Sequence, residues 1–193
     1  MVLQRGAKAR IWGTADAGEQ VTVSIGQQKQ TATADAKGAW AVTLDAMEPA
    51  DPLEMTVAGK NSIKLENILV GEVWVCSGQS NMEMSLGGCA NAKDEAAAAN
   101  YPKIRHFGLQ KAVAATPLTE AKGAWAVCTP QTASGFTGVG YFFARHLNKE
   151  LNVPIGLIHT SWGGTACAPW TSREGLDAVP ELKHYVAQLD STA

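Results

Sequence analysis

The stretch that decides the fold is Val73–Met82, VWVCSGQSNM, in which an apolar run changes abruptly into small and polar residues. The apolar residues that lead into Cys76 are typical of a strand buried on both faces of a parallel sheet. In open α/β sheets, ligands bind beyond the carboxyl ends of such strands. A sharp strand-to-helix turn at this point would expose a serine Oγ. We therefore interpret Ser80 as the candidate nucleophile, and rank Ser77 lower because it lies closer to the strand.

The run does not match the nucleophile elbow of α/β-hydrolases. That pattern, G-x-S-x-G, needs a second glycine two residues after the serine, and Met82 stands there in this chain. Small polar residues at the end of a strand more often form an ordinary turn. Spacing alone therefore leaves the role of Ser80 open.

A second loop of the same kind follows a later apolar strand, Ile155–His159. It reads Ser161-Trp162-Gly163-Gly164-Thr165. Without a Cβ, a glycine pair leaves backbone N–H groups open to close approach, which an oxyanion hole requires. Glycine also permits positive φ. Gly163 and Gly164 are therefore candidate oxyanion-binding residues.

Residues 1–68 are predicted to form a small β-sandwich. Short runs alternate apolar and polar residues, and turn residues such as Asp35-Ala36-Lys37-Gly38 separate them, at the spacing typical of a sandwich. The predicted strands include Val21–Ile25, Thr31–Thr33, Trp40–Leu44, Leu53–Val57 and Ile63–Leu65.

From residue 69 to residue 193, strands alternate with helical segments, which predicts an α/β domain with a parallel sheet. Three apolar strands are expected, at Val70–Cys76, Ile104–Phe107 and Ile155–His159. Helices are expected at Ala92–Asn100 and Thr137–Leu151. Thr171-Ser172-Arg173-Glu174 fits a capping box that opens a last helix.

Bulk composition excludes several classes of function. The 193 residues carry a net charge of −2 without a basic stripe, so nucleic acid is not the expected partner. No apolar run approaches the ~18 residues of a membrane helix, so no membrane association is expected either. The four cysteines lack the C-x-x-C spacing of a metal site, and no metal is predicted. Disulfides and the redox compartment stay open.

The run Gly71–Glu83 resembles the signature of the sialate O-acetylesterase family, which belongs to the SGNH (GDSL-like) hydrolases. Gly138–Arg145, Pro154–Thr165 and Trp170–Glu174 continue the similarity, which extends over nearly the whole chain. The resemblance implies a β-rich region followed by the first part of a three-layer α/β/α hydrolase domain. It also implies that this chain is the N-terminal portion of a longer enzyme.

The resemblance assigns roles to the candidate residues. Ser80 corresponds to the nucleophile, and its backbone N–H to one oxyanion donor. Gly163 or Gly164 corresponds to the second donor. No metal or organic cofactor is implied. The implied reaction removes O-acetyl groups from carbohydrates through an acyl-enzyme on Ser80.

Half of the expected machinery is missing from the sequence. The family takes its base from a D-x-x-H motif and a further oxyanion donor from a Gln-Gly-Glu-Ser-Asn run, and neither occurs here. His184 and His159 are the local alternatives for the base, although a helix surface and a buried strand explain them more simply. His106 and His146 are expected to be structural. We therefore predict weak or no turnover by this chain alone.

Other residues have two readings each. Trp74, Trp162 and Trp170 could stack on a sugar or fill cores. Arg173 could bind a substrate carboxylate or form a salt bridge. Cys76 and Cys167 flank the candidate loops and could act as thiol nucleophiles, although buried structural cysteine is the commoner state.

The partner and the location are less constrained by the sequence. An acetylated carbohydrate is the expected substrate, with acetylxylan or another acetylated sugar as alternatives to sialate. A non-catalytic glycan-binding fragment is the alternative class of function. An incomplete sheet would expose an edge suited to self-association. The resemblance favours a periplasmic or secreted enzyme with a clipped N-terminus, so the localisation stays open.

Overall fold

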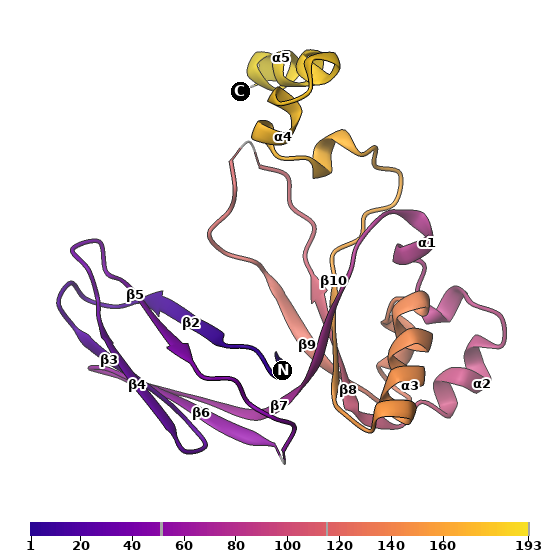
Figure 1. Cartoon of the computed structure of the whole chain (residues 1–193). Helices are drawn as coiled ribbons and strands as arrows, with labels where there is room; N and C mark the ends of the chain where they lie inside the picture. Colours follow the sequence, from indigo (N-terminus) through magenta and orange to yellow (C-terminus); the bar gives the residue numbers. More distant parts are fainter. Residues whose placement is uncertain (51, 115, 193) are drawn as a thin grey trace.

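The computed structural model describes residues 1–50, 52–114 and 116–192 (Figure 1). Its N-terminal region consists of two packed β layers, as predicted. One layer is the antiparallel run β4-β3-β6-β7, and the other is the antiparallel pair β2-β5. Alternation explains the packing, since every second residue of β5 is buried. The strands that precede β7 are β1 (Val2–Gln4), β2 (Ala9–Thr14), β3 (Gln20–Ile25), β4 (Gln28–Thr33), β5 (Ala39–Leu44) and β6 (Leu53–Ala58).

One long strand, β7 (Ser62–Cys76), belongs to both regions of the molecule. It pairs antiparallel with β6 up to Ile68, then in parallel with β1 at residues 69–71, and in parallel with β10 (Ile155–His159) at residues 72–76. Asn67 has φ 55° where the register with β6 shifts. Asparagine tolerates this left-handed conformation better than most residues. The predicted division after residue 68 falls within this continuous strand, and it stays a prediction.

The second region has the strand order β7-β10-β8-β9. β8 (Tyr101–Leu109) is parallel to β10, and β9 (Gly123–Cys128) is antiparallel to β8. Sequence reasoning did not predict β9. The predicted helices are present as α2 (Ala92–Ala97) and α3 (Gly138–Leu151), which lie together beside this part of the sheet (Figure 1). The predicted α/β class with parallel strands is thus confirmed.

The core of the second region lies between the sheet and α3. Thr137 caps this helix, because its side chain accepts a hydrogen bond from the Gly140 N–H. Asn152 ends it in the left-handed conformation. Buried residues of the sheet and of α3 share one cluster, which includes Cys76, Ile104, Cys128, Tyr141, Ala144, Ile155 and Leu157.

Predicted burial on both faces of β7 is wrong near its end. Trp74 is 44% exposed and Val75 is 65% exposed. On the sheet edge opposite β10, β1 ends at Gln4, whose Oε1 accepts the Val73 N–H at 2.8 Å. Beyond Val73, no other described strand pairs with this edge of β7. The sequence indicated an apolar strand but not how far its neighbours extend.

The capping box predicted at Thr171–Glu174 is also wrong in detail. Ser172 is the N-cap of α4 (Arg173–Asp177) and accepts from the Gly175 N–H, while the Thr171 hydroxyl donates to the Cys167 carbonyl. This helix is not the last one, because α5 (Lys183–Thr192) follows it. The remaining helical turns are α1 (Ser80–Glu83), η1 (Leu86–Gly88), η2 (Ala133–Gly135), η3 (Ala168–Trp170) and η4 (Pro180–Leu182). None of the helices in the described part of the chain is long and apolar enough to span a membrane.

Candidate active site

Ser80 is the first residue of α1, in the turn that follows β7. Gly78 has φ 129°, which a residue with a side chain rarely adopts, and this conformation makes the sharp exit from the strand possible. The Met84 N–H donates to the Ser80 carbonyl at 2.9 Å and closes the helical turn. Ser80 is exposed. The strand-to-helix placement predicted for the nucleophile is therefore present.

The second candidate loop runs beside this turn. The Thr160 N–H donates to the Cys76 carbonyl at 3.0 Å, and the Trp162 N–H donates to the Gly78 carbonyl at 2.9 Å. These bonds extend the parallel pairing of β7 and β10 beyond the ends of both strands. A Cβ added to Gly163 would lie 3.5 Å from the Ser80 Oγ. The structure thus brings together Ser80 and the glycine pair.

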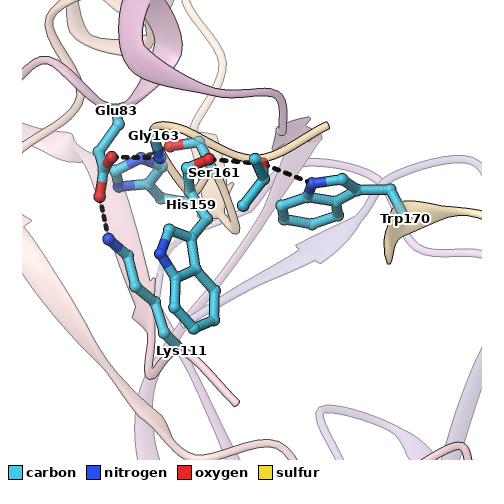
Figure 2. Close-up of polar contacts among 8 residues, drawn as sticks. Glu83, Lys111, His159, Ser161, Gly163 and Trp170 are labelled. Carbon is cyan, nitrogen blue, oxygen red and sulfur yellow. Dashed lines mark hydrogen bonds and ion pairs between the residues drawn. The ribbon is translucent and has the colours of Figure 1, made fainter. Parts of the chain in front are cut away.

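The Gly163 N–H is already engaged. It donates to the Glu83 Oε2 at 2.5 Å, and the other carboxylate oxygen of Glu83 forms an ion pair with Lys111 (Figure 2). Lys111 and the Gly163 N–H together hold the pKa of Glu83 below its ordinary value, since both stabilise the carboxylate. Glu83 is therefore an anion near neutral pH.

Gly164 and Ser80 offer the other candidate oxyanion donors. Gly164 has φ 77°, and no atom lies within 4 Å of a Cβ added to it. Within the described residues, no hydrogen bond engages the backbone N–H of either residue. Both backbone N–H groups are therefore free, within the described part of the chain, to donate a hydrogen bond to a ligand.

His159, one candidate base, forms a hydrogen bond within the loop that follows its own strand. Its Nε2 lies 2.5 Å from the Ser161 Oγ (Figure 2). Burial lowers its pKa, and Lys111 lowers it further against the opposing effect of Glu83. Its ring centre is 5.2 Å from that of His106, which is buried and stacks on Phe136. His106 is thus a core residue, as predicted.

His184, the other candidate base, lies exposed near the start of α5. Its Nδ1 is 2.9 Å from the Glu181 carbonyl oxygen, and its ring lies against Tyr185. His146 is exposed on α3. Across residues 1–50, 52–114 and 116–192, no hydrogen bond joins any histidine to Ser80. The described residues therefore provide Ser80 with no histidine base.

The tryptophans differ in their surroundings. Trp74 packs edge-on against Phe143 at 5.0 Å between ring centres. The Trp162 ring lies beneath the Lys111 ammonium at 5.2 Å. Trp170 is 46% exposed, and its Nε1 donates to the Thr165 Oγ1 at 2.8 Å (Figure 2). Trp74 and Trp170 both expose much of their rings, but of the three only Trp170 lines the pocket beside the serine turn.

A shallow pocket of about 420 Å³ lies beside Trp170, between the two loops. Ser77 and Gln79 line it from the serine turn, and Thr165 and Cys167 line it from the second loop. Its polar hydroxyl and amide groups next to an aromatic ring are the kind of surface that a sugar contacts.

Arg173 and the cysteines have structural surroundings. The Arg173 guanidinium makes two hydrogen bonds to Asp190, at 2.6 and 2.9 Å, so its salt-bridge reading is the one observed. All four cysteines are free thiols. Burial raises the pKa of Cys76, which disfavours its thiolate as a nucleophile. Cys167 is exposed.

Comparison with known proteins decides the family. Residues 70–191 match the family model of the carbohydrate esterases described as sialic acid-specific acetylesterases. The chain belongs to this family. The predicted resemblance to sialate O-acetylesterases is thus confirmed.

Similar proteins agree with this membership. Sialate O-acetylesterase from Rattus norvegicus is 35% identical over 206 residues, which cover 95% of this chain and 38% of that protein. The human sialate O-acetylesterase is 35% identical over 213 residues, which cover 99% of this chain and 40% of that protein. The chain therefore spans about two fifths of the length of these relatives.

A solved structure also resembles this fold. It is a carbohydrate acetylesterase from Xanthomonas citri, with a TM-score of 0.88 and 35% sequence identity over 90% of this chain and 40% of that chain. Both β layers and the α/β region are thus part of a known carbohydrate esterase architecture.

Sequence reasoning missed Glu83 and Lys111 in the site. Glu83 lies three residues after Ser80, a spacing that puts two side chains on one side of a helical turn. This signal was available once a helix was expected after Ser80. Lys111 lies in the connection between β8 and β9, where no pattern in the sequence indicates a partner.

Proposed function

We propose that this chain carries the nucleophile half of a serine esterase that removes O-acetyl groups from carbohydrates. The observation that supports this proposal most is that the loops after β7 and β10, two neighbouring parallel strands, lie side by side. The exposed Ser80 Oγ lies 3.5 Å from the position of a Cβ added to Gly163. Acyl transfer requires a nucleophile next to backbone donors, and the two loops that carry Ser80 and the glycine pair lie side by side here.

In the proposed reaction, the Ser80 Oγ attacks the carbonyl carbon of the acetyl ester as a base removes the hydroxyl proton. The tetrahedral oxyanion accepts hydrogen bonds from the Ser80 N–H and from a glycine N–H of the second loop. The bond between the acetyl carbon and the sugar oxygen then breaks, and that oxygen takes up a proton. Water hydrolyses the acetyl-serine and releases acetate. None of these steps needs a metal.

The base is proposed to come from the part of the relatives' length that this chain does not span. Loss of the base from model serine hydrolases lowers kcat by a factor on the order of a million, and leaves a residual contribution from oxyanion binding. We therefore expect turnover by this chain to be close to background.

The test is hydrolysis of p-nitrophenyl acetate with and without added imidazole, which supplies an external base. The wild-type chain and the Ser80→Ala and Ser77→Ala variants are compared. We expect imidazole to produce a rate above the Ser80→Ala background in wild type and in Ser77→Ala. Equal rates in wild type and Ser80→Ala would count against the nucleophile. Fast Ser80-dependent turnover without imidazole would show that the chain contains its own base.

The sialate ester is the proposed substrate, on the strength of the family. Acetylxylan and other acetylated sugars are the alternatives, because substrate choice depends on the loops around the site rather than on the fold. Turnover of O-acetyl sialate against acetylxylan in the same assay separates them.

A second candidate is glycan binding without chemistry, which the exposed ring of Trp170 beside the pocket favours. Calorimetry with a deacetylated glycan tests it. Saturable binding that Ser80→Ala leaves unchanged and Trp170→Ala abolishes would support this candidate, and no heat of binding would contradict it.

We also propose that the open edge of β7 mediates self-association. It presents unpaired backbone groups next to the exposed side chain of Val75.

A further inference from the structure

Glu83 lies within the candidate site but has no part in the proposed acyl transfer. It is the last residue of α1, one helical turn after Ser80. Its carboxylate reaches across to the glycine loop and accepts the Gly163 N–H at 2.5 Å. This is a hydrogen bond to a charged acceptor, which is stronger than one between neutral groups.

Lys111, in the connection between β8 and β9, brings a third segment of the chain into contact with the Glu83 carboxylate. Its ammonium pairs with Glu83 and lies 5.2 Å from the centre of the Trp162 ring, next to Gly163 in the chain. Both side chains of the ion pair are partly exposed, so the pair alone contributes little to stability. Its effect is to direct the Glu83 carboxylate toward the loop. The serine turn, the glycine loop and the β8–β9 connection thus meet at one side chain (Figure 2).

This contact bears on which amide binds an oxyanion. A backbone N–H has a single hydrogen, so the Gly163 N–H cannot serve Glu83 and an oxyanion with full strength at once. An oxyanion there would also lie next to the negative charge of Glu83. The Gly164 N–H has no hydrogen-bond partner among the described residues, and the space around its Cα is open.

We propose that Glu83 is a positioning residue: it holds the glycine loop against the serine turn through the Gly163 N–H, and oxyanion binding falls to the N–H groups of Ser80 and Gly164. This inference rests on the proposed esterase function. It chooses between the two glycines that the sequence left as alternatives.

The first test reads the contact directly, by amide NMR of the ¹⁵N-labelled chain. Wild type is compared with Glu83→Gln, which keeps an acceptor but no charge, and with Glu83→Ala, which keeps neither. Glu181→Gln is the control for removal of an exposed carboxylate elsewhere. We expect the Gly163 amide proton far downfield in wild type and in the control, and progressively upfield in the Gln and Ala variants.

Hydrogen exchange at Gly163 should also become faster, by about tenfold or more in Glu83→Ala. Unchanged amide resonances of β8 and α3, which belong to the same region as Glu83, show that the variant is folded. A Gly163 resonance and exchange rate that are the same in wild type and Glu83→Ala would overturn the proposal.

The second test reads the consequence for Ser80. With imidazole added as the external base, the rate of Ser80 labelling by a fluorophosphonate probe is measured in the same variants, with Ser80→Ala as background. We expect labelling to fall by about tenfold or more in Glu83→Ala, with an intermediate rate in Glu83→Gln. If Glu83 merely blocked the Gly163 N–H, its removal would free that donor and speed up the labelling of Ser80. An unchanged or faster labelling rate in Glu83→Ala would therefore overturn the positioning role. Absence of Ser80 labelling in every variant would count against the nucleophile, while the Gly163 resonance still decides whether Glu83 holds the loop.

Discussion

At the scale of single residues, the buried side chain of His106 makes the stability of the core beneath the site depend on pH. Its side chain is buried in β8, its ring stacks on Phe136, and its Nε2 lies 3.5 Å from the Thr137 backbone nitrogen. Burial and the proximity of His159 lower the pKa of His106 from 6.5 to about 4. The neutral ring is therefore the form that the folded protein contains at neutral pH.

This shift predicts a loss of stability in mild acid. The unfolded chain, with an ordinary histidine pKa of about 6.5, binds more protons than the folded chain between about pH 6.5 and pH 4. The free energy of unfolding should therefore fall as the pH is lowered through this range, by about 2 kcal/mol between pH 7 and pH 5 from His106 alone. Urea unfolding at both pH values measures it, with His106→Phe to remove the contribution and His146→Gln as the exposed control. The same pH dependence in wild type and His106→Phe would contradict the prediction.

The residues of the site were predictable to different degrees. Ser80 follows one apolar strand, and Gly163 and Gly164 follow another. Because the carboxyl ends of parallel strands lie at the same edge of a sheet, these residues could be expected to lie close together. Glu83 was not predicted, because its partner is a backbone amide distant in the sequence. His159 could be placed on a strand from the sequence, but only the structure shows that its ring forms a hydrogen bond with Ser161.

At the scale of elements, the start of α3 supports the serine turn. The Thr137 Oγ1 donates to the Met82 carbonyl at 2.6 Å and accepts from the Gly140 N–H. One buried hydroxyl thus caps a helix and holds the turn that carries Ser80.

Thr137→Ala should lower the free energy of unfolding by about 1–3 kcal/mol, since it removes both the cap and a buried hydrogen bond. Thr137→Ser retains the hydroxyl and should lose less than about 1 kcal/mol. Urea denaturation of the three proteins measures the difference. Equal losses in both variants would show that the methyl group, and not the hydroxyl, carries the effect.

The bend in β7 gives a second prediction at this scale. Asn67 has φ 55°, and its Oδ1 accepts a hydrogen bond at 3.1 Å from Arg105, which is buried. Asn67→Gly loses only that bond, whereas Asn67→Ala also forces a Cβ into the left-handed conformation. The alanine variant should therefore be less stable than the glycine variant by about 1 kcal/mol in thermal or urea unfolding. An alanine variant as stable as the glycine variant would contradict a required left-handed bend.

Elements with a long and regular pattern were predicted well. The helical spacing of apolar residues located α3, and its flanking residues Thr137 and Asn152 act as caps. The short strand β9 was missed because six residues that include Gly123 and two alanines give a weak strand signal. The cap of α4 was misplaced by one residue because Thr171 and Ser172 are both acceptable N-caps, and only the fold selects between them.

At the scale of the whole molecule, the open edge of β7 is the feature with the clearest consequence. Its end pairs with β10 on one side only within the described residues, and Val75 is exposed there. Unpaired strand edges with apolar side chains pair with other chains. The order of the strands, β7-β10-β8, was not predictable, because local patterns indicate strands but not their neighbours.

We predict that the chain self-associates at this edge. Its mass by light scattering should rise with concentration, and Val75→Lys should shift it toward the monomer because a charge on an edge opposes pairing. Val113→Lys is the matched control, since Val113 is 89% exposed and lies away from β7 in the β8–β9 connection. A monomer at every concentration in wild type would contradict the prediction.

The most direct test of the central claim is to locate the acetyl group on the chain itself. The chain is incubated with p-nitrophenyl acetate, the reaction is stopped with acid, and the acetylated residue is identified by peptide mass spectrometry. With imidazole added as the external base that acylation requires, we predict a single acetyl group on Ser80, and none at this position in Ser80→Ala. Acetylation at Ser77 or Cys167 instead, or no acetylation at Ser80, would contradict the assignment of Ser80 as the nucleophile.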